Sequence, residues 1–246
     1  MKQLFLLFVV LLMVCSCSDE ILNEDNHQAI LGASNVTFSF DSITSPANWR
    51  IYQSLEEMLE ACQIPEDKLS SMSTDELIEV CMSHPLHSIY FAYDNELDGA
   101  KVVFENFNGF QELKRRSDAP EKVIDFYSDV NFNTKAQHLR RKNFSKFTYI
   151  GFIELYLASK ELPDLYEGSN LMYLERISNE VLDMKLAQPV KKMHSISRSL
   201  LINSQIAIER GNLSQEDEKV LKAFVLSGGK EQDPQVYTTV STIISK

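Results

Sequence analysis

Apolar residues recur at helical spacing through most of the chain beyond residue 49. Leu77, Ile78, Cys81 and Met82 lie at intervals of one, three and four positions, so a helix would place them on one face. An apolar stripe of this kind has to be buried against another stripe. The pattern therefore predicts a series of amphipathic helices that pack on one another. Comparable stripes occupy 55–62, 95–107, 119–130, 134–160, 170–187, 189–210, 214–226 and 234–244.

Residues typical of helix starts stand before several of these stripes. Ser73 and Glu76 fit a capping box, in which each side chain accepts a backbone N–H at the start of the helix, and Ser54 with Glu57 repeats the pattern. Asp94 or Asn95 can cap the helix over 95–107.

Proline and glycine predict where helices stop. Pro85 lacks an amide N–H and disfavours helical backbone at the residue before it, so we expect one helix to end there and another to run over 86–94. Asn108 and Gly109 tolerate positive φ and are expected to end the helix over 95–107.

These elements predict an all-α fold. We expect an irregular multi-helix bundle or helical solenoid of about nine or ten short to medium helices. The length of the segment 49–246 suits a single α-helical domain. No run of short alternating strands bounded by turn residues interrupts it.

The first residues carry an export signal. One lysine precedes an apolar run and then Cys15, Ser16 and Cys17, a pattern typical of a secretory signal peptide and too short to span a bilayer comfortably. The segment resembles a bacterial lipobox with Cys17 as the lipidated residue. Cys15 is the competitor, but the bulky Val14 before it fits poorly into a peptidase pocket for small side chains. We therefore expect a signal peptide over 1–16.

A polar tether is expected over 17–48. It contains Gly32, Pro46 and several Asn and Ser, and it has little regular periodicity. Val36, Phe38 and Phe40 alternate with polar residues, so a short extended segment on the domain is one alternative to plain tether. Trp49 is the only tryptophan and is expected to dock the end of the tether onto the domain.

Several short stretches resemble those of lipoproteins from Bacteroidetes. Ser18, Asp19 and Glu20 are similar to the acidic export signal next to the modified cysteine in that group. That resemblance implies an outer-membrane lipoprotein exposed at the cell surface, with a periplasm-facing protein as the alternative. The segments around Leu59 to Pro65 and Leu77 to Phe110 are similar to those of uncharacterised surface lipoproteins with an all-helical domain, a resemblance that implies no activity.

The triplet around Ser42 also resembles a pattern from this group. Asp41, Ser42 and Ile43 are similar to the three-residue O-glycosylation site of Bacteroidetes envelope proteins. A plain loop serine is the alternative.

The charge balance excludes one class of partner. The formal net charge is −11, whereas a nucleic-acid partner requires a basic footprint. One local run between residues 134 and 147 is basic without an acid between its members. It suits a solvated helix face, or alternatively a contact with an anion or a lipid headgroup. The run consists of Lys135, Arg140, Arg141, Lys142 and Lys146.

The mature domain retains two cysteines if Cys15 is removed and Cys17 is lipidated. In an oxidising compartment Cys62 and Cys81 can form a disulfide, since each lies near the end of a short helix. Two buried reduced thiols that act as small hydrophobic side chains are the other alternative.

No catalytic residue, metal ligand or cofactor site is predicted. His84 and His87 stand near acidic residues, but Pro85 keeps them from sharing one helix face, so we expect histidines in solvent or at a helix cap. Phosphate loops, zinc-protease and serine-hydrolase motifs and Cys-x-x-Cys pairs are missing from the sequence. We expect a non-enzymatic module that binds envelope proteins or glycans and is held at the membrane by its lipid. A hydrolase whose residues converge from separate helices is the alternative.

Overall fold

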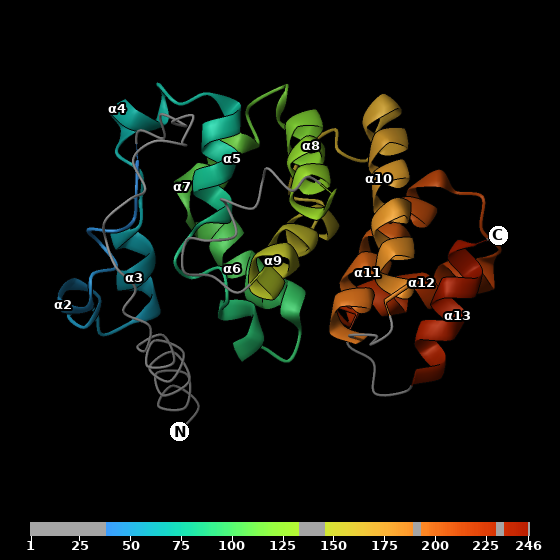
Figure 1. Cartoon of the computed structure of the whole chain (residues 1–246). Coiled ribbons are helices and arrows are strands. Elements are labelled where there is room, and N and C mark those ends of the chain that lie inside the picture. The colour runs from blue at the N-terminus through green and yellow to red at the C-terminus, as the bar shows by residue number, and fades with distance from the viewer. Residues whose placement is uncertain (1–37, 133–145, 189–192, 230–233, 246) are drawn as a thin grey trace.

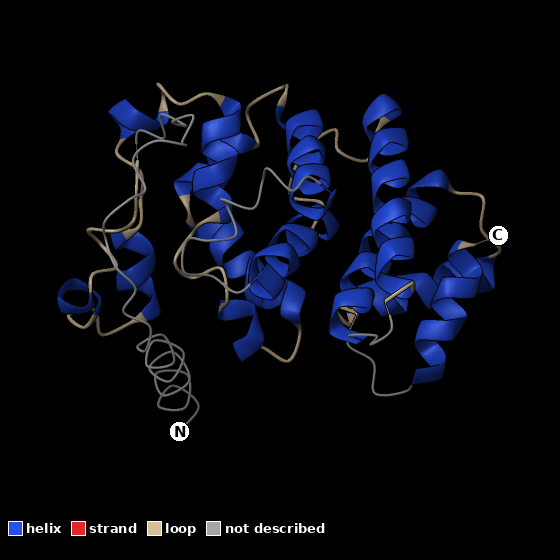
Figure 2. Ribbon diagram, viewed as in Figure 1, coloured by secondary structure: helices blue, strands red, loops and turns tan. Residues whose placement is uncertain are grey.

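The structure confirms the all-α class. A computed structural model describes residues 38–132, 146–188, 193–229 and 234–245, and these residues form helices, turns and loops without any strand (Figure 2). The helices of the N-terminal half are α2 (Pro46–Trp49), α3 (Leu55–Ala61), α4 (Glu66–Leu69), α5 (Thr74–Met82), the 3-10 helix η1 (Ile89–Ala92), α6 (Glu96–Asn106), α7 (Asn108–Leu113), α8 (Ala119–Phe132) and α9 (Lys146–Ala158). Those of the C-terminal half are α10 (Gly168–Leu186), α11 (Met193–Arg210), α12 (Gln215–Leu226) and α13 (Pro234–Ile244).

The described helices outnumber the nine or ten expected because several are very short. Twelve are α-helices, and α2 and α4 have only four residues each. Short helices of this size depend on tertiary packing for their stability. Among the described residues, no helix has both the length and the apolar character needed to cross a bilayer.

Two groups of helices lie side by side. The N-terminal half forms one group and the C-terminal half the other, with α8, α9, α10 and α11 at the border between them (Figure 1). Across that border α11 packs on α9, and α10 packs on α8. Within its own half α11 also contacts α10, α12 and α13, so it is the central helix of the C-terminal half.

The predicted helix starts are mostly confirmed. Ser73 and Glu76 form the complete capping box at the start of α5. Ser54 caps α3, but the carboxylate of Glu57 accepts the N–H of Gln53, one residue earlier than in a capping box. Gly211 follows α11 with a φ of +69°, which fits its predicted role as a stop.

The helix predicted over 86–94 is wrong in length. Only η1 forms there, within a series of turns in which a backbone N–H donates to the carbonyl three residues earlier. Examples are His87 N to His84 O and Ile89 N to Leu86 O, both 2.9 Å. The side chain of His84 accepts the N–H of Leu86 at 3.1 Å. A side chain that takes a backbone donor in this way competes with an α-helical ladder.

The helix predicted over 95–107 ends where expected, since α6 stops at Asn106, but Asn108 and Gly109 do not end it through positive φ and instead begin α7. The amide of Asn108 exchanges two hydrogen bonds with the backbone of Ile64, at 3.0 and 2.8 Å, and so ties α7 to the loop after α3. A Cβ atom at Gly109 would lie 2.4 Å from the ring of Phe107 and 2.9 Å from the sulfur of Cys81. Close packing, and not positive φ, is therefore what requires glycine there.

The segment 38–44, which we call the strap, lies on the helical body although it was expected within the tether. It forms turns and not a strand; Phe40 is buried and Phe38 and Ile43 are half-buried against the core. Trp49 is half-buried as well, and its ring centroid lies 5.8 Å from that of Tyr52, consistent with docking of this end.

Ser42 is exposed in a turn of the strap, and its glycosylation stays a prediction. Residues 1–37, including Cys17, lie outside the described ranges.

Cys62 and Cys81 are both free and buried in the structure. Cys62 ends α3, whereas the sulfur of Cys81 lies beneath Gly109 of α7. Burial raises the pKa of the Cys62 thiol to about 12 and that of Cys81 well above its ordinary value. Of the two alternatives left open by the sequence, the structure has the pair of buried thiols.

Thiol counting distinguishes the two alternatives. We expect the denatured, unreduced mature domain to show two reactive thiols, and the native domain to react slowly because both groups are buried. The measurement is reaction with a chromogenic disulfide reagent with and without denaturant. A denatured protein with no reactive thiol at these positions would instead establish the disulfide.

Candidate functional site

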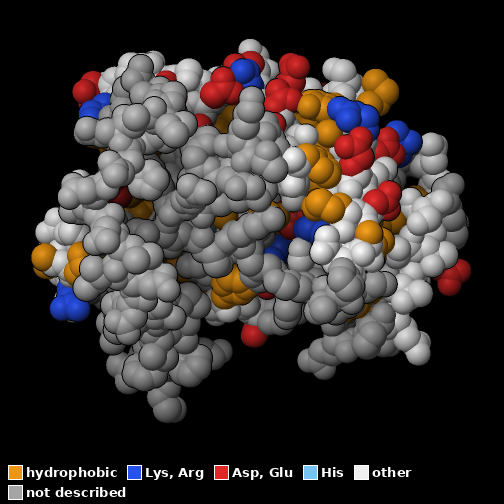
Figure 3. Space-filling model, viewed as in Figure 1, with side chains coloured by type: hydrophobic (Ala, Val, Ile, Leu, Met, Phe, Trp, Pro, Cys, Tyr) orange, Lys and Arg blue, Asp and Glu red, His pale blue; other side chains and the backbone are white. Residues whose placement is uncertain are grey.

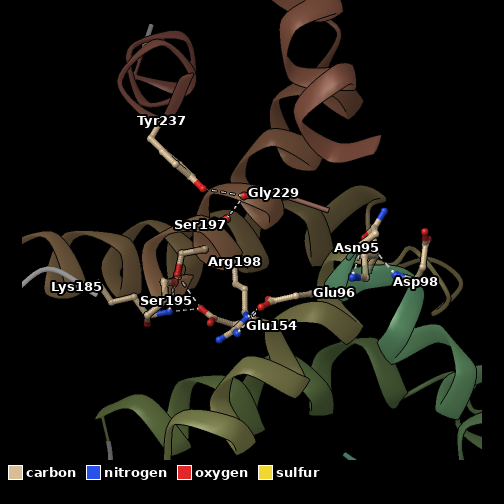
Figure 4. A network of polar contacts seen from close by, with 12 residues as sticks. Asn95, Glu96, Asp98, Glu154, Lys185, Ser195, Ser197, Arg198, Gly229 and Tyr237 are labelled. Atoms are coloured by element: carbon tan, nitrogen blue, oxygen red, sulfur yellow. Dashed lines mark hydrogen bonds and ion pairs between the residues drawn. The ribbon is translucent and has the colours of Figure 1, made fainter. Parts of the chain in front are cut away.

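The strongest cluster of titratable groups lies at the border between the two halves. Glu154 of α9 is fully buried, and its Oε1 accepts hydrogen bonds from groups on three other helices. The donors are the Tyr127 hydroxyl of α8 at 2.9 Å, the Ser199 hydroxyl of α11 at 2.7 Å and the Lys185 ammonium of α10 at 2.5 Å. A single carboxylate therefore connects four helices. Figure 4 shows the Glu154 carboxylate next to the Lys185 ammonium.

Lys185 is placed as an ammonium donor. Besides Glu154, its Nζ donates to the Ser199 hydroxyl at 2.8 Å and to the carbonyl of Ser195 at 2.9 Å. Burial lowers the pKa of Lys185, and the negative charge and hydrogen bond of Glu154 oppose that effect. The same burial, together with the charge of Glu154, raises the pKa of Tyr127 well above its ordinary value, so this hydroxyl remains a donor.

A second ion pair lies next to the first. Arg198 of α11 is 1% exposed and donates from Nε and one terminal nitrogen to both oxygens of Glu96 in α6, at 2.8 and 3.2 Å. Its guanidinium lies over the ring of Tyr90, 5.0 Å from the centroid. Burial by itself would lower the pKa of Arg198, but its hydrogen bond to Glu96 and the nearby negative charges outweigh that effect and raise the pKa.

Gly151 makes room for this pair. A Cβ atom at Gly151 would lie 2.5 Å from the Tyr90 hydroxyl and 2.6 Å from a terminal nitrogen of Arg198. The absence of a side chain on α9 is therefore what lets Arg198 reach across the border.

One asparagine joins the ends of two helices from opposite halves. The Oδ1 of Asn95 accepts the N–H groups of Leu97 and Asp98 and so caps α6, while its Nδ2 donates to the carbonyl of Leu226 at the end of α12. A Cβ atom at Gly228 would lie 2.0 Å from that Oδ1, so only glycine fits beside the cap. Next to it the Ser197 hydroxyl donates to the carbonyl of Gly229 (Figure 4).

The polar groups of this cluster are occupied with one another. Ser199 lies between a lysine and a carboxylate, as a hydrolytic nucleophile would, but its side chain is fully buried. Three acceptors surround the Lys185 ammonium, so it lacks the free lone pair that a general base needs. The cluster therefore acts as a buried ionic layer, meaning Glu154, Lys185, Arg198 and Glu96, that joins the two halves.

The histidine pair is not in solvent, contrary to expectation. His84 and His87 are 0% and 2% exposed, and the ring of His84 lies 4.6 Å from that of Phe107. The turns around Pro85 fold both rings inward, and Nδ1 of His87 lies 2.9 Å from the carbonyl oxygen of His84. Within the described ranges no group of three or more His, Cys, Asp or Glu side chains could hold a metal ion.

Other sequence candidates fall at different places. The basic run is outside the described ranges, apart from Lys146 at the start of α9, whose side chain is not described. A shallow hollow of about 270 Å³ lies between α3 and the end of α6, lined by Glu56, Leu59, Glu60, Gln63 and Asn106. Gln63 already hydrogen-bonds to Leu59, Asn106 and Asn108, so its amide holds the walls together.

The ionic layer was not predicted from the sequence, although two charged residues on apolar helix faces indicate it. Lys185 stands four residues after Val181 and therefore on the apolar stripe of α10. Glu154 stands in the almost uniformly apolar run of α9. Charged residues on an apolar stripe are buried only when paired, so the two together indicate a buried ion pair.

Comparisons of the chain with protein-family models, with curated proteins and with solved structures find no match.

A double-mutant cycle tests whether Glu154 and Lys185 are coupled. Lys185→Met leaves a buried carboxylate unpaired and should lower the free energy of unfolding by about 3–5 kcal/mol. In Glu154→Gln/Lys185→Met the amide oxygen still accepts from Tyr127 and Ser199, so the double variant should recover most of that loss. Urea unfolding measures all variants.

The matched control is the pair Arg176 and Glu180 on α10, whose side chains are 59% and 50% exposed. Removing it should cost no more than about 1 kcal/mol, with weak coupling. Equal losses for Lys185→Met and Arg176→Met would contradict the buried ionic layer.

Proposed function

We propose that this protein is a lipid-anchored component of the cell envelope whose helical body binds a partner without catalysing a reaction. The anchor is Cys17 behind the signal peptide over 1–16, and the location is the outer membrane with the body facing the cell exterior. A lipid anchor of several acyl chains contributes about 0.8 kcal/mol for each buried methylene, which is ample for stable attachment.

The buried charges support a scaffold and not a reaction site. The cluster that resembles the hydrolase alternative, with residues converging from separate helices, uses its carboxylate, ammonium and hydroxyl on one another. An enzyme needs such groups directed at a space that a substrate can enter. Here they are directed at each other inside the core, which keeps the surface helices in a fixed arrangement.

Exposed apolar side chains on neighbouring helices carry the proposal. Met172 of α10 is 61% exposed and Phe132, the last residue of α8, is 43% exposed. Hydrophobic side chains gather over α8 and its border with α10 (Figure 3). An apolar area of this kind on a monomer marks an interaction site, and Met adapts well to a partner's surface. It favours a protein partner of the envelope over a glycan.

The anchor is tested by metabolic labelling with an alkyne fatty acid. We expect the full-length chain expressed in its own cells to be labelled, and Cys17→Ala to lose the label because no thiol remains at the lipobox position. Cys15→Ala is the matched control and should keep the label. Labelling that persists in Cys17→Ala and disappears in Cys15→Ala would contradict the assignment.

The apolar surface is tested by affinity capture from outer membranes of the source organism. The wild-type body should retain an envelope protein that Phe132→Glu/Met172→Glu fails to retain, since two carboxylates would have to be desolvated at the contact. Ile51→Glu is the control, because Ile51 is 64% exposed but lies beside α2 in the N-terminal half. Capture that both variants preserve, or capture through a glycan, would reject this surface.

A further inference from the structure

The strap closes over the buried histidine His84. Phe40 of the strap is 7% exposed, and its ring centroid lies 5.4 Å from that of His84 and 6.0 Å from that of Phe107. The strap holds its shape by two backbone hydrogen bonds of 2.9 Å, from the N–H groups of Ile43 and Thr44 to the carbonyl of Phe40. The aromatic ring of Phe40 therefore forms one wall around the imidazole.

The hydrogen bonds of His84 require the neutral imidazole. Its Nδ1 accepts the backbone N–H of Leu86, which leaves the proton of the neutral ring on Nε2. A protonated ring would carry a hydrogen on both nitrogens, so Nδ1 could no longer accept from Leu86. Nε2 is buried without a hydrogen-bond partner among the described residues. A charged His84 thus has no place beneath the closed strap.

Among the residues that the structure describes, the neighbours of His84 offer no compensating charge. The strap contributes the ring of Phe40, and its one charged residue, Asp41, is exposed at the surface. The junction of α6 and α7 contributes Phe107, and Cys81 of α5 remains a neutral thiol because burial raises its pKa. The titratable group next to His84 in the same turn is His87, whose positive charge would repel a second one.

Burial is the main reason why both rings stay neutral. It lowers the pKa of His84 to about 3, with a smaller contribution from His87. It also lowers the pKa of His87 to about 4, although the hydrogen bond to the backbone of His84 opposes the shift. The ring of His87 packs on Phe152 of α9 and not on the strap, so the two histidines report on different parts of the structure.

We propose that the strap is an acid-sensitive latch, which opens when His84 takes up a proton. Opening removes Phe40 from the imidazole and exposes both nitrogens to water, which solvates the charge. The rest of the helical body keeps its core, because the strap contributes only Phe40 to the fully packed interior and lies at its edge.

The direction of the pH dependence follows from proton linkage. The open form binds a proton with the ordinary histidine pKa of about 6.5, whereas the closed form binds it only near pH 3. Between these values the open form holds more protons, so falling pH favours opening. At pH 5 the ratio of open to closed strap should be ~30-fold higher than at pH 7.5.

The latch would change how far the body stands from the membrane, a consequence that depends on the proposed anchor at Cys17. The strap lies between that cysteine and α2, so an open strap adds residues 38–44 to the tether. An extended chain of that length adds roughly 25 Å of reach.

Hydrogen exchange of the purified chain in solution tests the latch without any membrane, so a failed anchor would not affect the result. We expect the amides of Ile43 and Thr44 to lose protection as the pH falls from 7.5 to 5, after correction for intrinsic exchange rates. The loss should approach ~30-fold while amides of α9 stay protected. The readout is mass spectrometry of the peptide that covers the strap.

Three variants make the test specific. His84→Asn keeps an acceptor for Leu86 but cannot titrate, so its strap should show no pH dependence. His87→Asn is the matched control and should behave as wild type, whereas Phe40→Ala should open the strap already at pH 7.5. Strap protection that is independent of pH, or that disappears only together with α9, would overturn the latch. So would an unchanged pH dependence in His84→Asn.

Discussion

A fully buried carboxylate is the constraint on which the rest of the structure depends. Glu154 lies at the centre of an apolar helix, where an unpaired charge would cost several kcal/mol. Its hydrogen bonds to Tyr127, Lys185 and Ser199 make the charge tolerable only when α8, α10 and α11 are all in place. The two halves thus meet in one register. Asn95 adds a second point of registration, since one amide completes helix ends on both sides of the border.

Local features of the fold were predictable, because they depend on residues close in sequence. Ser73 with Glu76, Asn95 and Gly211 mark helix ends where the structure has them. The end of α6 was predicted as well, but the role of Asn108 was not, because its hydrogen bonds to Ile64 join distant segments at the start of α7. Similarly, His84 was expected at the surface because its contact with the strap could not be predicted. The rings of Phe40 and His84 that meet there are more than 40 residues apart in the sequence.

The candidate site could not be predicted from the sequence for a related reason. Lys185 and Glu154 each stood out only as a charge on an apolar stripe, and their pairing is a tertiary fact that spacing does not contain. The residues that carry the proposed function are not those of the candidate site. The proposed anchor, strap and partner-binding surface all lie outside the ionic layer, which supports them by fixing the helices. The two ion pairs of the layer carry no net charge, since each joins one carboxylate to one cation.

The central claim is that buried charge makes the two halves one cooperative unit. Urea unfolding at pH 7.5 tests this with two probes: fluorescence of Trp49, which lies in the N-terminal half, and far-UV circular dichroism of all helices. We expect the two probes to report coincident unfolding transitions for the wild type. They should report separated transitions for Arg198→Met, which leaves Glu96 without its partner. Separate transitions in the wild type, or an unchanged single transition in Arg198→Met, would contradict it.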